Sequence, residues 1–552
     1  MSRAPTAVNG AALAVAALER AGVEVTFGLP GVHNLALWRA LGESPIRLVG
    51  VRHEQTAAYA ADGYARTTGR VGVALTTTGP GAANTLAAVG EAWASRQPVL
   101  VIATDIPARL RRPGVWRGVL HEATDQAAMF APVVKRTLRV TKAAVLGRAV
   151  AEAVAEALAL PQRPVYLEVP TDLLGAEVGG EAEAGVLPAR AAALPLDDEH
   201  LERAAVLLER SRRPLVWAGG GALQAGAGEA VAALAERLVA PVILTYSARG
   251  LLPPGHPCLV QAPPHVAAVG ALWDEADVVL AVGSDLDGMM TQGWAMPQPP
   301  HLVALNVDPE DAAKNYLPDL LLEGDAAEGL RLLAGSLSPR GGLESLRRRL
   351  SELNARVRAE VERTEPRAAV LLDIFARGLP EQATVVCDMC IPGYWLGGFH
   401  QPPAPRRMLY PLGWGTLGCA FPQALGAALA APGPVVSVSG DGGFLYACGE
   451  LATAAQERIP LTAVVVDDGG YGMLRYDQDR RGDPHLGVDL LSPDFTALAD
   501  SFGVRSFAAD GLDANFGAAL RRQLALDQPS LLVAEDSLGP PPNVSPRWYR
   551  RG

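Results

Sequence analysis

The sequence predicts an α/β protein made of three doubly wound parallel-sheet domains. The chain has 552 residues, which at roughly 150 residues per domain indicates several domains rather than one. Short apolar runs alternate with helical patterns in three blocks, as in sheets built from βαβ units. Two stretches without this pattern, at about 178–199 and 335–342, separate the blocks. We therefore expect domains at 1–177, 195–335 and 360–537.

The first and third blocks repeat one plan. In the first block we expect strands at 47–51, 71–76 and 99–103 and helices at 57–67 and 82–93. In the third block we expect strands at 435–439 and 461–466 with a helix at 450–458 between them. The middle block has expected strands at 214–217, 278–282 and 302–307. Ligands of open parallel sheets bind beyond the carboxyl ends of strands, so the turns after these strands are where chemistry is expected.

Composition and charge exclude several classes of protein. Hydrophobic residues make up 49% and charged residues 19%, which is typical of a globular chain rather than a disordered one. The net charge of −11 repels nucleic acid and anionic membranes, so neither is an expected partner. The most apolar long stretch, residues 143–160, carries charges at helical spacing and predicts an amphipathic helix. Nothing near the N-terminus is typical of a secretory signal, and the expected location is the cytoplasm.

The five cysteines are too few for a disulfide framework in a chain of this length. Cys387 and Cys390 form a single CxxC without a second pair or a histidine at ligand spacing. Zinc binding and redox chemistry are therefore possible interpretations of this motif, but buried cysteines at a strand end are the favoured one.

Two aspartates mark a candidate metal site in the third block. Asp441 follows one expected strand within Gly440-Asp441-Gly442, and Asp468 follows the next strand 27 residues later. A right-handed crossover of this length makes the strands near neighbours, about 5 to 10 Å apart. Carboxylates and the carbonyl of Gly470 are hard oxygen ligands that suit Mg²⁺ shared with a phosphate. Helix capping would explain either aspartate alone, but not their spacing.

These motifs resemble the thiamine-diphosphate-dependent enzymes of the acetolactate synthase and pyruvate decarboxylase superfamily. The first block matches this family at 27–31, 53–54, 61–66 and 78–84. Together with the third-block motifs, these matches spread over almost the whole chain. The resemblance implies the three-domain fold of these enzymes, with pyrimidine-binding, central and diphosphate-binding domains, and thiamine diphosphate and Mg²⁺ as cofactors. It assigns the metal to Asp441, Asp468 and the Gly470 carbonyl. The cofactor-binding residues that it implies are Gly31, Glu54, Gly415, Leu417, Gly440, Asp441, Gly442, Gly443, Asp468, Gly470, Tyr471, Gly472 and Met473.

The chain departs from the family by having Asp467-Asp468 where Asn-Asn is usual. An added carboxylate attracts the cation more strongly and repels the diphosphate more strongly, so its net effect on cofactor affinity is undetermined from the sequence. A catalytically inactive, cofactor-binding protein is therefore one alternative to an enzyme.

Glu54 is the expected catalytic residue. In the family, this glutamate hydrogen-bonds N1′ of the aminopyrimidine and so promotes loss of the thiazolium C2 proton. The role requires a carboxyl in a site largely closed to water, where desolvation raises its pKa. Taken alone, Glu54 is more typical of a helix cap or of a surface ion pair with Arg52 than of a catalytic acid.

Gly413 to Gly418 forms a second glycine-rich segment. The resemblance implies that the Gly415 carbonyl contacts the 4′-amino group and that Leu417 is the apolar wedge under the bent cofactor. Acetolactate synthases generally have Met at the wedge, and Leu is more typical of a decarboxylase. A strand-to-helix turn without any such role is the alternative.

The substrate side gives weaker signals. Met473 and Leu474 resemble the apolar pair of acetolactate synthases, and no glutamate stands where pyruvate decarboxylases have a proton donor. The expected reaction is thus decarboxylation of a 2-oxo acid with carboligation to a second carbonyl, as in acetolactate synthase. Asp477 stands where those enzymes place a Trp, so the alternative is a decarboxylase that releases an aldehyde from a larger or cationic 2-oxo acid. His33, His121 and Gln126 are further pocket candidates, with loop or capping roles as the alternative.

The middle block raises the question of a nucleotide. It lacks the arginines that flank FAD in many acetolactate synthases, and Gly219-Gly220-Gly221 is not a full GxGxxG because Gln224 takes the last position. FAD is not favoured, and a nicotinamide dehydrogenase is a remote alternative. The resemblance also implies a homodimer or homotetramer, because Glu54 and Asp441 belong to domains that meet across a subunit interface in the family.

Overall fold

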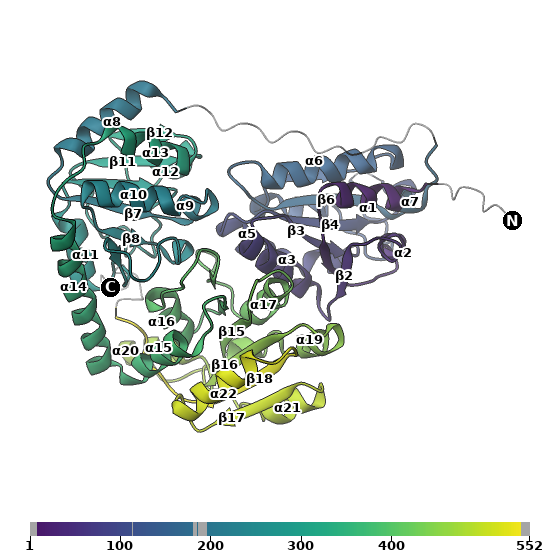
Figure 1. Cartoon of the computed structure of the whole chain (residues 1–552). Helices are drawn as coiled ribbons and strands as arrows, with labels where there is room; N and C mark the ends of the chain where they lie inside the picture. The colour runs from purple at the N-terminus through teal and green to yellow at the C-terminus, as the bar shows by residue number, and fades with distance from the viewer. Residues whose placement is uncertain (1–7, 113, 180–184, 186–195, 543–552) are drawn as a thin grey trace.

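The computed structural model describes residues 8–112, 114–179, 185 and 196–542. Three six-stranded sheets, all parallel, confirm the expected fold class (Figure 1). Most of the separator predicted at about 178–199 lies outside the described residues, namely 180–184 and 186–195. The expected start of the second domain, residue 195, is among them. The expected start of the third domain, residue 360, lies inside one long helix, α14 (Leu343–Thr364).

The first sheet has the strand order β2-β1-β3-β4-β6-β5. Its strands are β1 (Val25–Gly28), β2 (Arg47–Gly50), β3 (Gly72–Thr76), β4 (Val99–Asp105), β5 (Arg136–Arg139) and β6 (Val165–Pro170). Its helices are α1 (Gly10–Arg20), α2 (Leu35–Leu41), α3 (Glu54–Thr68), α4 (Pro80–Ala83), α5 (Leu86–Ala94), α6 (Leu146–Leu158) and α7 (Thr171–Gly175). The apolar stretch at 143–160 is the amphipathic helix α6, as expected.

Two expected helices of this domain differ from those observed. Helix α3 starts at Glu54 rather than at 57, because the His53 side chain caps the helix by accepting from the Gln55 N–H. The helix expected at 82–93 is two helices, α4 and α5, which are separated at Asn84 and Thr85. The first change places Glu54 in the first turn of a helix rather than in a loop.

The middle sheet has the order β12-β11-β10-β7-β8-β9. Its strands are β7 (Pro214–Ala218), β8 (Val242–Leu244), β9 (Leu259–Val260), β10 (Val278–Val282), β11 (Leu302–Asn306) and β12 (Leu320–Glu323). Its helices are α8 (Asp198–Arg210), α9 (Gly220–Gln224), α10 (Gly228–Leu238), α11 (Ala267–Glu275), α12 (Pro309–Ala313) and α13 (Ala326–Ser336). Helix α14 then runs along the outside of the molecule to the third domain (Figure 1).

The third sheet has the order β14-β13-β15-β16-β18-β17, the same pattern as the first. Its strands are β13 (Thr384–Cys387), β14 (Met408–Leu409), β15 (Val435–Gly440), β16 (Leu461–Asp467), β17 (Arg505–Ala509) and β18 (Ser530–Glu535). Its helices are α15 (Pro366–Gly378), α16 (Ile391–Phe399), α17 (Ala420–Ala428), α18 (Asp441–Phe444), α19 (Leu451–Glu457), α20 (Gly472–Arg481), α21 (Phe495–Ser501) and α22 (Ala514–Leu524).

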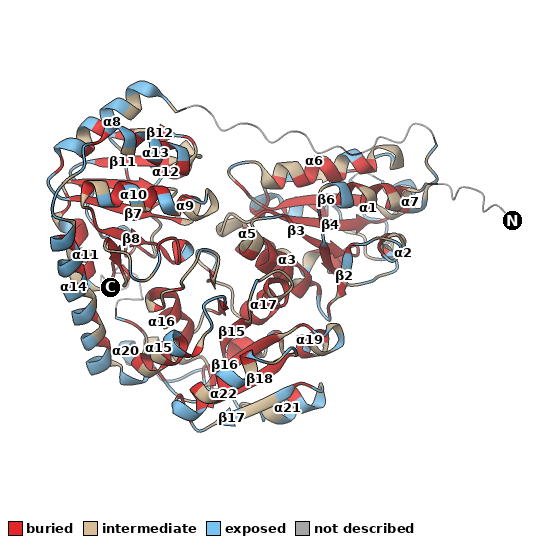
Figure 2. Cartoon of the chain, viewed as in Figure 1, coloured by how far each residue is buried: buried red, intermediate tan, exposed pale blue. Residues whose placement is uncertain are grey.

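The first and third domains share a hydrophobic core. Helix α3 of the first domain packs against α17 of the third, and their facing residues are buried (Figure 2). Small residues allow the close approach, since the backbone at Gly63 lies against Gln423 and that at Gly426 against Ala60. This contact fixes the position of the Gly413–Gly418 segment, which precedes α17. Among the described residues, no helix combines the length and apolar content needed to cross a membrane.

Candidate functional site

The carboxyl ends of β15 and β16 build the centre of the candidate site. The two strands are parallel neighbours, with Gly440 paired to Val466, so Asp441 and Asp468 follow them at one edge of the sheet. They open on a cavity of about 140 Å³. Of the predicted cofactor residues, the cavity is lined by Leu417, Gly440, Asp441, Gly442, Gly443, Asp468, Gly470, Tyr471, Gly472 and Met473. The substrate candidate Leu474 lines the same cavity.

The acids at this edge repel one another. Asp441 is fully buried, and its burial, followed by the charges of Asp467 and Asp468, raises its pKa to about 6. Its Oδ1 atom is buried without a hydrogen-bond partner among the described residues. Ser492 Oγ lies 3.2 Å from the other oxygen, Asp441 Oδ2, and 2.8 Å from Asp467 Oδ1. A buried, unpaired carboxylate oxygen in a cluster of acids fits a cation.

The backbone of this site requires glycine at two positions. Gly470 has φ +153°, and a Cβ there would overlap the Val488 carbonyl oxygen. A Cβ on Gly472 would overlap Asp468 Oδ2. The described residues contain no group of three or more His, Cys, Asp or Glu side chains arranged for a metal. A cation here would therefore depend on two carboxylates, a backbone carbonyl and oxygens of the diphosphate.

Glu54 belongs to a separate cluster at the strand ends of the first domain. Its side chain is buried, and Oε2 accepts a hydrogen bond from Asn84 Nδ2 at 3.0 Å. Arg52, the alternative ion-pair partner, instead donates its backbone N–H to Glu450 and its guanidinium to Gln456 of the third domain. Glu54 has no ion pair within the part of the chain that the structure describes, so its carboxyl is held by neutral groups.

The other first-domain candidates surround the same turn. Gly31 and Gly81 both lie against Thr77, and Gly81 also lies beside Glu54. The rings of His33 and His121 meet edge to face at 5.4 Å, and the backbone of His121 packs on Gly79.

Gln126 is fully buried, with both ends of its amide engaged. Its Oε1 accepts from the Gly79 N–H, and its Nε2 donates to the Thr104 carbonyl and to the Tyr166 hydroxyl. These contacts hold the Gly79 turn in place, and a role of Gln126 in substrate binding stays a prediction.

The described structure does not bring the two clusters together around one cavity. Every residue that lines the cavity at Asp441 comes from the third domain. The contacts of Glu54 are with Asn84 and Gly81 of its own domain. The turns at 440–443 and 468–474, which line this cavity, are called the cradle below. That Glu54 meets the cradle across a subunit interface therefore stays a prediction.

The Gly413–Gly418 turn is held by two acids that the sequence analysis missed. Both carboxylate oxygens of Asp388 accept the Gly418 N–H, at 3.0 and 2.9 Å, and burial raises the Asp388 pKa to about 6. Glu91 of the first domain accepts the Gly415 N–H at 3.2 Å. Asp388 directly follows strand β13, inside the CxxC, so its place at a strand end was a usable signal. Glu91 sits in mid-helix and gave none.

Asp477 lies on α20, the helix that leaves the cradle. It follows Met473 by four residues, which places both on one face of the helix. Its charge contributes, after burial and the nearer acids, to the raised pKa of Tyr394, a residue that lines the cavity. Asp477 itself is not among the residues that line the cavity, so its contact with a substrate stays a prediction.

The middle-domain turns border two small cavities of about 130 and 50 Å³. Arg96 of the first domain reaches this cleft and forms ion pairs with Asp285 and Asp311. Lys314 pairs with the same two acids at 2.8 Å. The absence of FAD stays a prediction.

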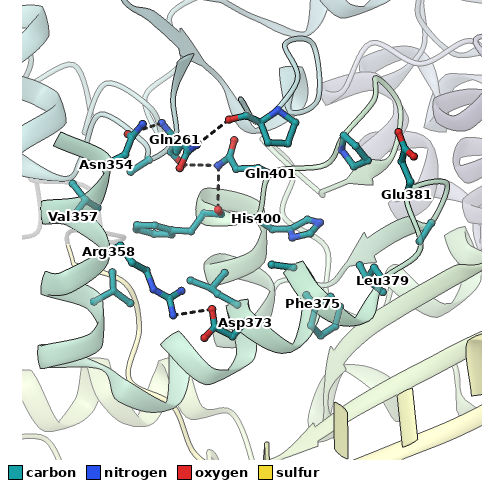
Figure 3. A pocket seen from close by; sticks show the side chains of 18 of the residues that line it. Gln261, Asn354, Val357, Arg358, Asp373, Phe375, Leu379, Glu381, His400 and Gln401 are labelled. Carbon is teal, nitrogen blue, oxygen red and sulfur yellow. Dashed lines mark hydrogen bonds and ion pairs between the residues drawn. The ribbon is translucent and has the colours of Figure 1, made fainter. Parts of the chain in front are cut away.

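A larger cavity, of about 560 Å³, lies between α14, α15 and the end of α16 (Figure 3). It holds none of the predicted site residues. Its polar groups bind one another: Arg358 pairs with Asp373 at 3.0 Å, and Gln401 donates to the Gln261 carbonyl. The Arg358 charge is therefore already paired, whereas Glu381, which also lines the cavity, has no ion pair among the described residues.

Comparison with known proteins agrees with this arrangement. Models of the thiamine pyrophosphate enzymes match the chain in three parts: the N-terminal TPP binding domain at residues 8–129, the central domain at 201–333 and the C-terminal TPP binding domain at 390–534. These ranges contain both clusters and the middle-domain cleft.

Full-length relatives extend the match. A protein of Pseudomonas aeruginosa named "Probable 2-ketoarginine decarboxylase" is 38% identical over 504 residues, covering 90% of this chain and 89% of that protein. An acetolactate synthase large subunit of Parasynechococcus marenigrum is 32% identical, covering 95% and 86%. A protein of Methanocaldococcus jannaschii named "Probable acetolactate synthase large subunit" is 30% identical, covering 90% and 87%. The chain thus belongs to the thiamine pyrophosphate enzymes, with one six-stranded sheet for each of the three domains of that family.

Proposed function

We propose that the protein is a thiamine-diphosphate- and Mg²⁺-dependent decarboxylase of a 2-oxo acid with a cationic or large side chain, and that it releases an aldehyde. The observation that carries the proposal is Asp477, an acid on α20 one helical turn after Met473, which lines the cavity. A carboxylate in this position favours a cationic tail through a charge-assisted hydrogen bond. The 38% identity to a protein named for 2-ketoarginine supports the same substrate class.

Carboligation, the main expectation from the sequence, has less support than this alternative. Met473 and Leu474 resemble the apolar pair of acetolactate synthases, but the relatives with that name are 30% and 32% identical. An acetolactate-synthase-like carboligase is therefore the second candidate.

The proposed roles follow from the two clusters. Asp441, Asp468 and the Gly470 carbonyl would hold Mg²⁺, because Asp441 Oδ1 is buried and unpaired at a cluster of acids. When bound, thiamine diphosphate supplies the thiazolium carbon that adds to the 2-oxo carbonyl and takes up the electrons released with CO₂. Leu417 supplies an apolar surface for the cofactor from within the cavity lining. Glu54 accepts a hydrogen bond from the neutral Asn84 amide and has no ion pair among the described residues, which suits a carboxyl that shares a proton with a ring nitrogen.

A homodimer or homotetramer with interfacial sites is part of the proposal. Large apolar side chains are exposed beside the first-domain cluster, with Trp116 at 67%, Leu120 at 64% and Val32 at 64%. Tyr446 and Leu474 are exposed beside the cradle, at 59% and 51%. Exposed apolar residues next to both half-sites are typical of surfaces that a second copy covers.

The test is to incubate the purified protein with thiamine diphosphate, Mg²⁺ and a panel of 2-oxo acids. CO₂ release is followed, and products are identified by mass. An aldehyde from the guanidino-bearing acid, with slow turnover of pyruvate, is the expected result. Acetolactate from pyruvate as the main product would replace the proposal with the second candidate.

A further inference from the structure

An arginine on α20 contacts the unusual acid of the metal site. Arg475 Nη2 donates to Asp468 Oδ1 and to the Asp468 carbonyl oxygen, each at 2.6 Å. Its Nη1 lies 3.5 Å from Asp489 Oδ1. Arg475 and Asp468 are mostly buried, with side chains 21% and 16% exposed. A charge-assisted pair this far removed from solvent is stronger than a surface pair.

The Arg475–Asp468 pair reduces the repulsion that the acids of the site would exert on a diphosphate. Three carboxylates, those of Asp441, Asp467 and Asp468, lie at the edge where a diphosphate is to bind. Members of the family usually have Asn at the positions of Asp467 and Asp468. Without a cation beside Asp468, the added negative charge would repel the phosphates.

Arg475 also joins two segments of the cradle. Gly470 forms a bridge with Asp489, the Tyr471 N–H donates to the Val488 carbonyl, and the Leu490 N–H donates to the Gly469 carbonyl. Arg475 contacts Asp468 on one of these segments and Asp489 on the other. The Arg475 guanidinium therefore offsets the charge of Asp468. It also links the Gly470 loop to the segment at 488–490 that holds this loop in place.

We propose that Arg475 is a positioning residue of the cofactor cradle, which neutralises Asp468 so that an acid can stand at the metal-binding position without repelling the diphosphate. The proposal rests on the assignment of Asp468 to the cofactor site and not on the identity of the substrate. It predicts that Arg475 and Asp468 are energetically coupled in cofactor binding.

The test is a double-mutant cycle read by calorimetric titration of the full-length protein with thiamine diphosphate at saturating Mg²⁺. Arg475→Met should weaken binding roughly tenfold or more, because it leaves a partly buried carboxylate unpaired beside the phosphates. Asp468→Asn in the same chain should return the affinity to within about threefold of the parent, because the amide needs no counter-charge. Arg480→Met is the matched control: it removes the same charge from the same helix, where Arg480 lies over the Tyr476 ring.

Two outcomes would overturn the proposal. The first is an affinity of Arg475→Met equal to that of Arg480→Met. The second is a double variant that binds as weakly as Arg475→Met, which would mean that the arginine acts independently of Asp468. Should Arg475→Met fail to fold, Arg475→Gln decides, because it keeps a hydrogen-bonding side chain and removes the charge: a loss of roughly tenfold or more is expected, and a smaller loss contradicts charge neutralisation. None of these readings depends on which 2-oxo acid the protein uses.

Discussion

The first and third domains share one strand order but differ in what their strand ends carry. In the first, Glu54 is a single buried carboxyl held by the Asn84 amide. In the third, burial and then the charges of two further acids raise the pKa of Asp441, and one of its oxygens has no partner within the described ranges. Because the two sheets have the same strand order, their loops lie at the same edge of each sheet. The side chains on these loops determine which ligand or reaction each edge suits. The first edge suits proton sharing with a neutral ring, and the third suits a cation and phosphates.

The middle domain shows a third outcome at its strand ends. Its acids Asp285 and Asp311 are paired with Arg96 and Lys314. Burial raises the pKa values of these acids, but the two cations outweigh it and leave them below the usual range. Neither acid has a buried oxygen without a partner among the described residues, unlike Asp441. Removing groups from each of the three edges should therefore have effects of very different kind and size.

The largest effect is expected at the third-domain edge. Asp441→Ala should weaken Mg²⁺-dependent retention of thiamine diphosphate by more than about 100-fold, because it removes a metal ligand outright. Cofactor content after gel filtration with Mg²⁺ measures this loss. Asp441→Asn keeps one oxygen and should fall between the parent and the Ala variant. Retention equal to that of the parent would remove Asp441 from the metal site.

Glu54→Gln tests the first-domain edge. Turnover should fall by about 100-fold or more, while the affinity for thiamine diphosphate changes little, because only the carboxyl can share a proton with the ring. Steady-state rates and calorimetric binding on the same preparation separate the two effects. Glu43→Gln, at an exposed position, is the control. Unchanged turnover would exclude Glu54 as the catalytic acid.

A smaller and more selective effect is expected at Asp477. Asp477→Asn should raise KM for a guanidino-bearing 2-oxo acid roughly tenfold, because a charge-assisted hydrogen bond becomes a neutral one. KM for neutral 2-oxo acids should hardly change. Asp477→Trp should shift preference toward small neutral substrates. Asp479→Asn, an exposed acid on the same helix, should leave both values unchanged. Equal changes for charged and neutral substrates would argue against the pocket assignment.

The smallest effect on the reaction is expected at the middle-domain edge. Arg96→Met should lower Tm by about 3 to 6 °C, because it leaves Asp285 and Asp311 only partly compensated by Lys314. Cofactor affinity should stay within about twofold, since the contact lies outside the cradle. Differential scanning calorimetry measures the stability, and the exposed Arg39→Met is the control. A loss of cofactor affinity without a change in Tm would contradict a structural role.

The sequence alone determined the α/β fold class with its three blocks, eight of the strands, and the position of Asp441 and Asp468 after neighbouring strands, whereas strands such as β1, β5 and β14 were not predicted. Periodicity and strand-end spacing are local properties, and in parallel sheets they also locate the edge where ligands bind. Helix boundaries were less certain, as the His53 cap and the division between α4 and α5 illustrate.

Only the tertiary structure decided which distant groups act on those residues. Asp388 and Glu91 hold the Gly415 turn from two domains, Ser492 reaches Asp441 and Asp467, and Arg475 pairs with Asp468. These contacts join segments up to 324 residues apart, and chain spacing carries no record of them. They depend on which strands become neighbours and on how α3 packs against α17, and both are fixed by burial of apolar surface over the whole molecule.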